Sequence, residues 1–485
     1  MSEFLGTTGL VLNEPLLWER GKKGRCGYSL PPRDVPDSPL PEELAGEGPD
    51  FPDLSEVEVV RHYTRLSTWN FGVDTGFYPL GSCTMKYNPK TNDRQASLKG
   101  FAAAHPLLPP ELSQGTLRLM ASLERDLAEI TGLAAVTLQP AAGAQGELTG
   151  MLIIHAYHRS LGKQRTKILV PDTAHGTNPA SAALCGYASV PVQSGAGGIL
   201  LPETVDALMD AETAGIMITN PNTLGLFEDN IRKIAGIVHE RGGLVYGDGA
   251  NMNAVMGIVK PGEIGVDILH QNLHKTFSTP HGGGGPGAGP VAVRKDLERF
   301  LPVPRIVERE GTYALREDCP ESVGRLLAFH GHFGVLVRAY SYIRSMGPDG
   351  LKQASRLAVL NANYIRQKLK GTLRLAYDRP CMHECVFSDQ YQHAEGITTL
   401  DMAKRLMDYG YHPPTIYFPL VVPGAIMIEP TETETKEDLD RFIAAFEAVA
   451  REAKENPQLL RDAPGRCKVR RLDETEAARN PCLTG

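Results

Sequence analysis

Residues 271–289 read QNLHKTFSTPHGGGGPGAG and follow directly on the short run 267–270, which predicts a strand. A lysine is normally a solvated surface residue, but Lys275 lies just beyond this strand, beside His274 and ahead of a run of glycines. That setting favours a partly buried amine that can form a Schiff base. The glycine run is a poor dinucleotide-binding fingerprint, because Pro286 interrupts it and a predicted strand, not a helix, comes next.

The sequence around this stretch alternates short β-rich runs with helical stretches. Long crossovers between the runs predict an α/β fold with a mostly parallel, doubly wound sheet. In such sheets, ligands bind beyond the carboxyl ends of the strands. The seven predicted strands are 135–138, 167–170, 189–192, 215–219, 244–247, 267–270 and 290–293.

Three more of these strands are followed by segments with unusual residues. Gln139–Gly146 is rich in small residues, which let backbone N–H groups at a helix start approach an anion, although a plain turn has the same composition. Asp172–Asn178 contains His175, which is suited to stacking on a planar ring or to proton transfer, or else is a structural histidine. Tyr246–Asn251 contains Asp248 between glycines, as a turn residue or as the partner of a cationic ring nitrogen.

Together the four segments offer what a pyridoxal phosphate (PLP) site needs. These are an anion cradle, a ring-stacking group, an acid for the ring nitrogen and a Schiff-base lysine, in that order along the chain. This order resembles fold type I PLP enzymes, whose large domain contains a seven-stranded sheet.

The sequence on either side of the α/β region has a different residue pattern. Between Pro31 and Pro52 there are seven prolines, which exclude a helix or a central strand and predict an extended arm. Beyond about residue 340, a helical pattern at 351–369, strand-like runs and a final helix at 436–455 predict a smaller α+β domain. We therefore expect an N-terminal arm with an active-site loop (1–105), a large PLP-binding domain (106–340), a small C-terminal domain (341–465) and a tail (466–485).

Composition narrows the possible partners and compartments. The chain has 485 residues, of which 42% are hydrophobic and 22% charged, as in ordinary globular proteins. The net charge of −7 makes nucleic acid an unfavourable main partner. No apolar run approaches the length of a membrane span, and the eight cysteines show no disulfide spacing, so we expect a cytoplasmic protein that binds no membrane.

Longer motifs carry a closer resemblance. The chain resembles the P-protein family of the glycine cleavage system, glycine dehydrogenase (decarboxylating), over nearly its whole length. At this length it is similar to the subunit of the two-chain form that keeps the lysine. The matching motifs are GFYPLGSCTMKYNPK (76–90), QPAAGAQGE (139–147), DTAHGTNPAS (172–181), TNPNTLGLFE (219–228), YGDGANMNA (246–254), LHKTFSTPHGGGGPG (273–287), FGVLVRAYSYI (333–343) and IEPTETE (428–434).

The resemblance implies a role for each candidate residue. Lys275 would attach PLP covalently, Asp248 would keep the ring nitrogen protonated, and His175 would stack on the ring. Either Asn220 or Thr223 would contact the phenolic oxygen of the ring. The remaining cofactor-binding residues that the resemblance implies are Gly143, Ala144 and Gln145 at the phosphate, with a contribution from His274, and Ala250 beside Asp248. Loop 76–90, with Ser82, Cys83 and Thr84, would lie at the mouth of the active site.

The resemblance also implies the reaction and its partners. Glycine would lose carbon dioxide, and its aminomethyl group would pass to the lipoyl arm of the H-protein. The other subunit of the two-chain enzyme, subunit 1, would complete an α2β2 heterotetramer. The alternatives are another PLP enzyme, such as an aminotransferase or a decarboxylase that releases a free amine, and a catalytically silent scaffold subunit. We expect no metal site, since Cys381–Cys385 (CMHEC) lacks a usual zinc spacing and is typical of a packed strand.

Overall fold

The computed structural model describes residues 14–48, 50–281 and 287–483. Residues 282–286 of the glycine run therefore lie outside the described part, as do the first residues of the predicted N-terminal arm. The chain divides into two compact units. The first combines the residues up to Gly76 with Gly465–Gly485, and the second is Phe77–Pro464.

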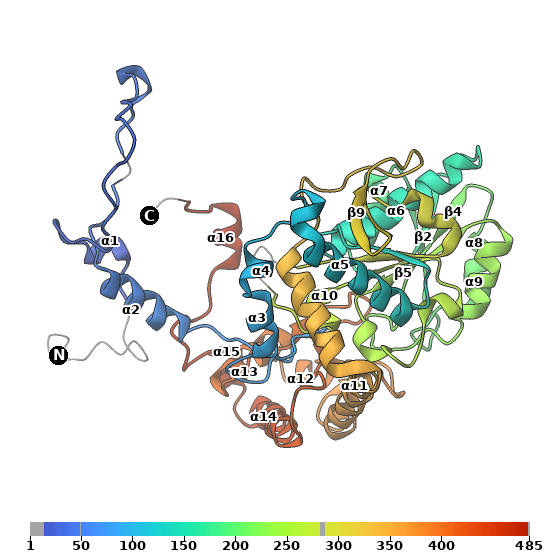
Figure 1. Ribbon diagram of the computed structural model, residues 1–485. Coiled ribbons are helices and arrows are strands. Elements are labelled where there is room, and N and C mark those ends of the chain that lie inside the picture. Colours follow the sequence, from blue (N-terminus) through green and yellow to red (C-terminus); the bar gives the residue numbers. More distant parts are fainter. Residues whose placement is uncertain (1–13, 49, 282–286, 484–485) are drawn as a thin grey trace. The chain divides into compact units, whose positions relative to one another are not determined.

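The second unit is built on a seven-stranded sheet, as the sequence predicts (Figure 1). All neighbouring strands are parallel except β7, which runs antiparallel to both β6 and β1. Every residue of β4 and β5 is buried, which is typical of strands covered by helices on both faces. In spatial order the strands are β1 (Ala135–Thr137), β7 (Val291–Val293), β6 (Ile268–Gln271), β5 (Leu244–Gly249), β4 (Thr213–Thr219), β2 (Lys167–Pro171) and β3 (Ala188–Val192).

Helices pack on both faces of this sheet and form two apolar cores. Helices α5, α8, α9 and the first part of α11 contribute to one core, and α6 and α7 to the other. Helix α5 begins with a proline and ends at Gly132, whose left-handed φ of 69° suits a residue without a side chain. These helices are α5 (Pro110–Thr131), α6 (Gly143–Ser160), α7 (Thr177–Leu184), α8 (Pro202–Leu208), α9 (Ile231–Glu240) and α11 (Phe333–Leu369).

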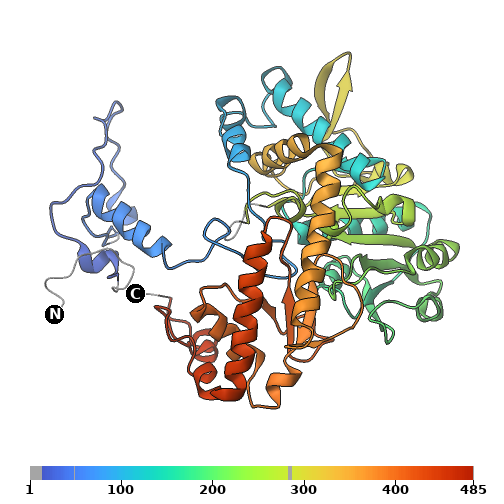
Figure 2. The ribbon, with the colours of Figure 1, turned by 90° about the horizontal axis from the view of Figure 1, so that it is seen from below.

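A smaller sheet follows α11. Helix α11 is interrupted at Gly347, where φ is 61°, and Pro348 starts its second part. That second part runs alongside α14 (Lys436–Glu455), as Figure 2 shows, and both helices cover the small antiparallel sheet. The side chain of Thr435 caps α14 by accepting a hydrogen bond from Asp438 N–H. The small sheet has the order β10 (Arg374–Leu375), β11 (Cys385–Ser388), β13 (Ala425–Ile428), β12 (Thr415–Ile416).

Short elements complete the second unit. Residues 77–105 belong to it, with α3 packed on α11 through an ion pair between Arg338 and Asp93 (2.7 Å). The others connect the larger helices and strands. They are α3 (Lys90–Ala96), α4 (Lys99–Ala102), η3 (Met252–Ala254), η4 (Pro261–Ile264), α10 (Leu273–Thr276), η5 (Lys295–Phe300), β8 (Arg305–Arg309), β9 (Thr312–Arg316), α12 (Gln390–His393), α13 (Thr399–Asp408) and α15 (Pro457–Arg461).

The first unit has few regular elements. Its helices are α1 (Leu17–Arg20), η2 (Glu42–Leu44), α2 (Glu56–Ser67) and α16 (Glu474–Arg479). A buried carboxylate ties its beginning to α2, since Glu14 accepts hydrogen bonds from Arg65 (2.5 and 2.6 Å) and lies 3.0 Å from His62. The Arg65 hydrogen bonds, with contributions from His62 and Arg20, hold the pKa of Glu14 down at about 2.

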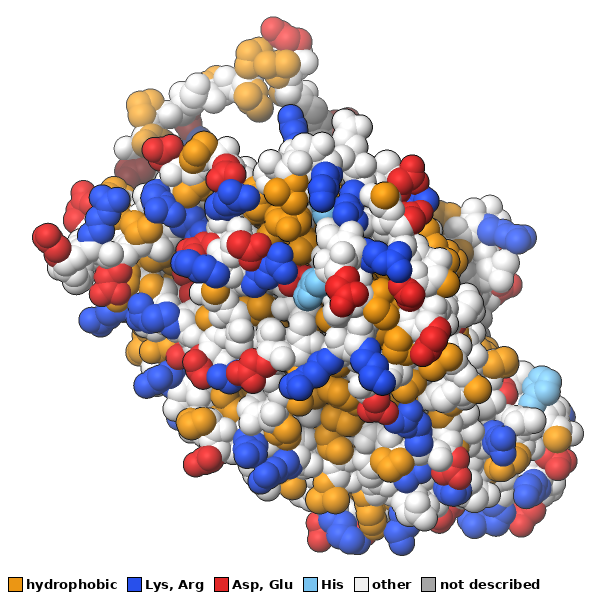
Figure 3. Space-filling model, turned by 90° about the vertical axis from the view of Figure 1, so that its right-hand side faces the viewer, with side chains coloured by type: hydrophobic (Ala, Val, Ile, Leu, Met, Phe, Trp, Pro, Cys, Tyr) orange, Lys and Arg blue, Asp and Glu red, His pale blue; other side chains and the backbone are white. Residues whose placement is uncertain are grey.

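Two surface properties bear on partners. None of the helices within the described residues combines the length and the hydrophobicity that crossing a membrane requires. On the face shown in Figure 3, acidic and basic side chains are interspersed, and no continuous field of one sign covers it.

Candidate active site

A cavity of about 200 Å³ lies where the carboxyl ends of β4, β5 and β6 meet the start of α6. The parallel register places the ends of the three strands side by side, with Thr219 opposite Asp248 and Asp248 opposite His270. The cavity brings together most of the residues that the sequence singles out. Those in its lining are Ser82, Gly143, Ala144, His175, Thr223, Asp248, Ala250, His274 and Lys275.

Lys275 lies on the one-turn helix α10, directly after β6. Its neighbours Leu273 and Thr276 are fully buried and hold this turn in place, while Lys275 itself is half-buried. Within the described residues, no hydrogen bond or ion pair engages Lys275 Nζ. An unengaged amine in a cavity is the arrangement that a Schiff-base lysine needs.

Asp248 is 3% exposed, and hydrogen bonds and nearby charges hold its carboxylate. Its Oδ1 accepts the Ala250 N–H at 2.9 Å, and Asn178 Nδ2 lies 3.4 Å from its Oδ2. Burial acts to raise the pKa of Asp248, but His270, the Ala250 amide and Lys275 outweigh it and hold that pKa below its ordinary value. Asp248 is therefore a carboxylate at neutral pH, as a partner for a protonated ring nitrogen must be.

Three residues of the cavity lining, His270, Asn272 and Asn251, were not predicted. Tyr246 Oη lies 2.6 Å from His270 Nδ1, and His270 Nε2 lies 2.9 Å from Asn272 Oδ1 and 3.4 Å from Asp248 Oδ1. Burial lowers the pKa of His270, which is therefore neutral at pH 7. His270 and Asn272 line the cavity, as does Asn251, and Tyr246 fixes the imidazole from behind.

Glu147, Thr177 and Thr219 complete the set that sequence reasoning missed. Thr177 Oγ1 donates to Glu147 Oε1 at 2.8 Å and lies 2.8 Å from His175 Nδ1. Glu147 Oε2 is buried without a partner among the described residues. Burial, reinforced by the charge of Asp248, raises the pKa of Glu147 to about 8.

The start of α6 is suited to hold an anion. Gly143 and Ala144 open this 18-residue helix, and no side chain caps its N-terminus. The first backbone N–H groups of a long helix point outward and favour a negatively charged ligand. A Cβ on Gly143 would come within 2.5 Å of Asn272 Nδ2, so a larger residue at this position would push the Asn272 side chain aside.

Four predicted residues do not line the cavity. Gln145 turns back on its own loop, since its Oε1 accepts the Ala141 N–H at 2.7 Å. Asn220 Oδ1 accepts the Glu228 N–H at 3.0 Å, and of the two candidates for the ring oxygen only Thr223 reaches the lining. In the loop that contains Ser82, Cys83 and Thr84 do not line the cavity. Burial raises the pKa of the Cys83 thiol, although the charge of Lys275 acts to lower it.

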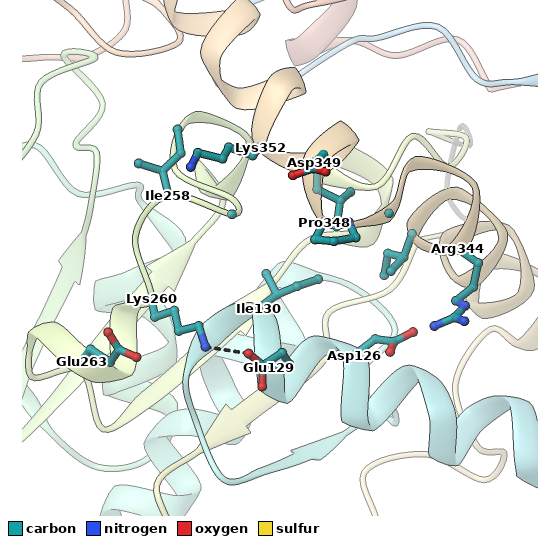
Figure 4. Close-up of a pocket in the computed structure, with 14 residues that line it drawn as sticks. Asp126, Glu129, Ile130, Ile258, Lys260, Glu263, Arg344, Pro348, Asp349 and Lys352 are labelled. Atoms are coloured by element: carbon teal, nitrogen blue, oxygen red, sulfur yellow. Dashed lines mark hydrogen bonds and ion pairs between the residues drawn. The ribbon is translucent and has the colours of Figure 1, made fainter.

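A larger cavity of about 620 Å³ is found elsewhere in the second unit (Figure 4). It lies between α5, the segment around Lys260 and the interruption of α11 at Gly347. Two lysines line it, Lys260, which donates to Glu129 at 2.6 Å, and Lys352 on the second part of α11. The smaller cavity combines a lysine with the buried Asp248 carboxylate and the uncapped start of α6, and is thus the better candidate for the active site.

The smaller cavity fits PLP on three independent counts: a helix start for the phosphate, a buried carboxylate for the ring nitrogen and an unengaged amine. With the seven-stranded sheet, these features define a PLP-dependent enzyme of fold type I. Residues 34–316 match the family model described as glycine cleavage system P-protein, and residues 354–463 match that of the glycine dehydrogenase C-terminal domain. The chain belongs to the glycine cleavage system P-protein family.

Similar proteins agree with this assignment over almost the full length. Proteins named probable glycine dehydrogenase (decarboxylating) subunit 2 are 57% identical in Caldanaerobacter subterraneus subsp. tengcongensis and 56% identical in Alkaliphilus oremlandii. The two alignments each cover 96% of this chain, and 98% and 97% of the relatives.

Solved structures support the fold. A glycine decarboxylase (P-protein) in inhibitor-bound form superposes with a TM-score of 0.73 at 23% identity, covering 84% of this chain and 93% of that one. A cysteine desulfurase from Thermococcus onnurineus NA1 superposes with a TM-score of 0.62 at 16% identity, covering 78% and 95%.

Glu147→Gln tests the neutral state of Glu147. A raised folded-state pKa means that the folded protein keeps a proton that the unfolded chain releases, so stability falls as pH rises from about 4.5 to about 8. Relative to Glu147→Gln, the unmodified protein should lose up to about 1.4 kcal/mol of unfolding free energy per pH unit in this window. Thermal or denaturant unfolding of both proteins between pH 5 and 9 measures the difference.

The exposed Glu129 provides the control. The hydrogen bond from Lys260 lowers its pKa, so the stability that this pair contributes is present above the ordinary pKa and is lost only in acid. The difference between Glu129→Gln and the unmodified protein should therefore stay constant from pH 5 to 9. A constant difference for Glu147→Gln as well would mean that Glu147 is ionised in the folded protein.

Proposed function

We propose that this chain catalyses the PLP-dependent decarboxylation of glycine in glycine cleavage and passes the aminomethyl group to the lipoyl arm of the H-protein. The observation that carries the proposal is the unengaged Lys275 amine in one cavity with the Asp248 carboxylate and the open start of α6. The names of the relatives, glycine dehydrogenase (decarboxylating), supply the substrate.

The bound cofactor supplies a ring that accepts the electron pair released when carbon dioxide leaves glycine. Lys275 Nζ would hold the cofactor covalently until the glycine amine binds. Asp248 holds a proton on the ring nitrogen, and the neutral His270 and the Ala250 amide keep its carboxylate oriented. The backbone N–H groups of Gly143 and Ala144 bind the phosphate.

His175 and Thr223 complete the positioning of the ring. His175 Nδ1 lies 2.8 Å from Thr177 Oγ1. This contact holds the imidazole where it can cover one face of a planar ring. Thr223, the one of the two candidates that lines the cavity, contacts the phenolic oxygen, and its hydroxyl donates to Thr173 O at 2.5 Å. Gln145 supports the phosphate cradle from behind, and His274, whose pKa burial lowers to about 3, offers the phosphate a neutral hydrogen-bonding group.

The transfer step balances in electrons and atoms. The two electrons left behind by carbon dioxide form a bond from the aminomethyl carbon to one sulfur of the oxidised lipoyl group. The disulfide bond breaks, and the second sulfur takes up a proton to become a thiol. No nicotinamide cofactor is required. Loop 76–90, through Ser82, Cys83 and Thr84, borders the path by which the lipoyl arm would enter.

A second, different subunit completes the proposed enzyme. The relatives are named subunit 2, which supports a partner chain. The first unit also leaves large apolar side chains exposed, among them Trp18 (61%), Tyr28 (74%) and Leu30 (81%). Several large apolar side chains exposed in one stretch of chain favour an interaction surface. We propose an α2β2 heterotetramer with subunit 1, in the cytoplasm, with lipoylated H-protein as the transient partner.

Lys275→Ala tests the proposal directly. The assay is exchange between glycine and labelled bicarbonate, in the presence of subunit 1 and lipoylated H-protein. Without the amine, exchange should fall to below a few per cent, while phosphate binding still retains some cofactor. Lys260→Ala, which removes a surface lysine, serves as the matched control. Exchange that H-protein does not stimulate in the unmodified complex would instead favour an aminotransferase or an amine-releasing decarboxylase.

Asp248→Asn should bind the cofactor but lose most activity, because a neutral amide cannot keep the ring nitrogen protonated. A loss of about 100-fold or more in kcat is expected, each tenfold step corresponding to about 1.4 kcal/mol of barrier. Asp267 is equally buried, at 3% exposure, but lies at the amino end of β6, away from the cavity at the carboxyl ends of the strands. Asp267→Asn is therefore the matched control. A near-normal kcat in Asp248→Asn would show that Asp248 only stabilises the turn and has no role at the ring nitrogen.

The purified chain alone should aggregate or be poorly soluble and should show little exchange activity. Interfaces between obligate subunits bury on the order of 2,000–5,000 Å² and are apolar, so their exposure favours association. Light scattering and the exchange assay, with and without subunit 1, measure both properties. A stable, soluble monomer with full exchange activity would contradict the proposed assembly.

A further inference from the structure

A buried cluster of acids lies in the small domain, outside the cavity lining. Glu384 precedes β11 and Glu429 follows β13, and the antiparallel pair Cys385–Ile428 places the two glutamates opposite each other across the strands. Both are fully buried, as is His383 beside them. One oxygen or ring-nitrogen atom from each of the three side chains lies within 4.8 Å of the corresponding atoms of the other two.

Each glutamate uses one carboxyl oxygen to hold the loop that borders the cavity. Glu384 Oε2 accepts the Ser82 N–H at 2.8 Å, and Glu429 Oε2 accepts the Thr84 N–H at 2.9 Å. Ser82 and Thr84 have left-handed φ values of 66° and 46°, which are unfavourable for residues with side chains. The loop therefore needs these acceptors to keep its shape, and Ser82 is its member in the cavity lining.

The other oxygen of each carboxyl group accepts no hydrogen bond within the described ranges 14–48, 50–281 and 287–483. Among the described residues, Glu384 Oε1, Glu429 Oε1 and both ring nitrogens of His383 are buried without a hydrogen bond. His383 Nε2 lies 3.9 Å from each glutamate. Two ionised carboxylates facing each other in a dry interior are strongly unfavourable, and a shared proton removes the repulsion.

We propose that Glu384 and Glu429 are positioning residues that hold a single proton between them, fix loop 82–84 at the rim of the cavity and leave one negative charge behind this rim of the cavity that contains Lys275. This inference deepens the proposed function and rests on it for its kinetic part only.

The electrostatic surroundings agree with one proton. Burial, followed by the charge of Glu429, raises the pKa of Glu384 well above its ordinary value, and burial raises that of Glu429 to about 7. Burial lowers the pKa of His383 to about 3, so the imidazole does not neutralise the pair. The other titratable groups whose charges act on the two glutamates are Lys275, Cys381 and Glu432, with Cys83 on the loop. Of these, Glu432 is already paired with Lys86 at 2.7 Å.

A spectroscopic titration tests the shared proton. In the PLP-loaded complex with subunit 1, the visible absorbance reports the pKa of the nitrogen that links Lys275 to the cofactor. Glu384→Gln leaves Glu429 ionised, and Glu429→Gln leaves Glu384 ionised, so each single variant should change this pKa little. The double variant removes the negative charge and should lower it by about one unit.

Infrared spectra of the cofactor-free complex give a readout that does not involve the proposed function. In the difference spectrum between the unmodified complex and the double variant, we expect the band of one buried, neutral carboxyl group, because the neutral Glu147 contributes equally to both spectra and cancels. Glu228→Gln is the matched control, since Glu228 is also buried and accepts a backbone N–H, from Leu200 at 2.8 Å, but is not among the groups whose charges act on Glu384 or Glu429. Glu228→Gln should leave unchanged the pKa of the nitrogen that links Lys275 to the cofactor.

The loop-holding role has a kinetic signature. Glu384→Ala removes the acceptor of the Ser82 N–H and should lower kcat for exchange at least tenfold, whereas Glu384→Gln retains an acceptor and should rescue most of it. If exchange is absent in the unmodified complex while the titration and infrared results hold, the proposed function fails and this inference stands.

Three results would overturn the inference. Equal, additive pKa shifts from the two single Gln variants would show two ionised carboxylates. An unshifted double variant would show that no charge faces Lys275. One divalent metal ion per chain, measured in the purified complex and lost in His383→Ala, would show that a cation, not a proton, neutralises the cluster.

Discussion

The register of three parallel strands is the constraint on which the site depends. Because β4, β5 and β6 run in the same direction, their carboxyl ends meet at one edge, and the pairing places Thr219, Asp248 and His270 next to one another. A slip of one residue would turn Asp248 to the other face of the sheet. The fully buried apolar runs of β4 and β5 fix this register, so the packing of the core determines where the carboxylate lies.

Burial then sorts the charges that this edge carries. Asp248 and Glu147 interact in the same cavity, yet the pKa of Asp248 is lowered and that of Glu147 is raised to about 8. The difference follows from their neighbours, since Asp248 has His270, the Ala250 amide and Lys275, while one oxygen of Glu147 has no partner among the described residues. One carboxylate beside one neutral carboxyl group is the arrangement that a ring nitrogen requiring a single anion can use.

The sequence predicts the sheet and the principal residues of the cavity well, because both follow from local patterns. Seven short β-rich runs predicted the seven strands, and Lys275, Asp248 and His175 lie within five residues of the ends of three of these runs. Glu147, His270 and Asn272 were missed because their role depends on neighbours from other strands. The run of polar residues at 270–272, just ahead of Lys275, was the available signal. Side-chain direction was also beyond sequence reasoning, as Gln145 shows by turning back to Ala141.

The small domain contributes to the site through the backbone of one loop. Residues 80–84 lie on its sheet, where Leu80 bridges to Ile428 and Thr415 Oγ1 donates to Gly81 O at 2.7 Å. A Cβ on Gly81 would come within 2.2 Å of Met427, so the approach requires glycine. Ser82 nevertheless borders the cavity formed by the large sheet. Any shift of the small domain therefore moves the rim of the cavity, and the buried carboxyl pair at Glu384 and Glu429 is the link through which that shift acts on the loop.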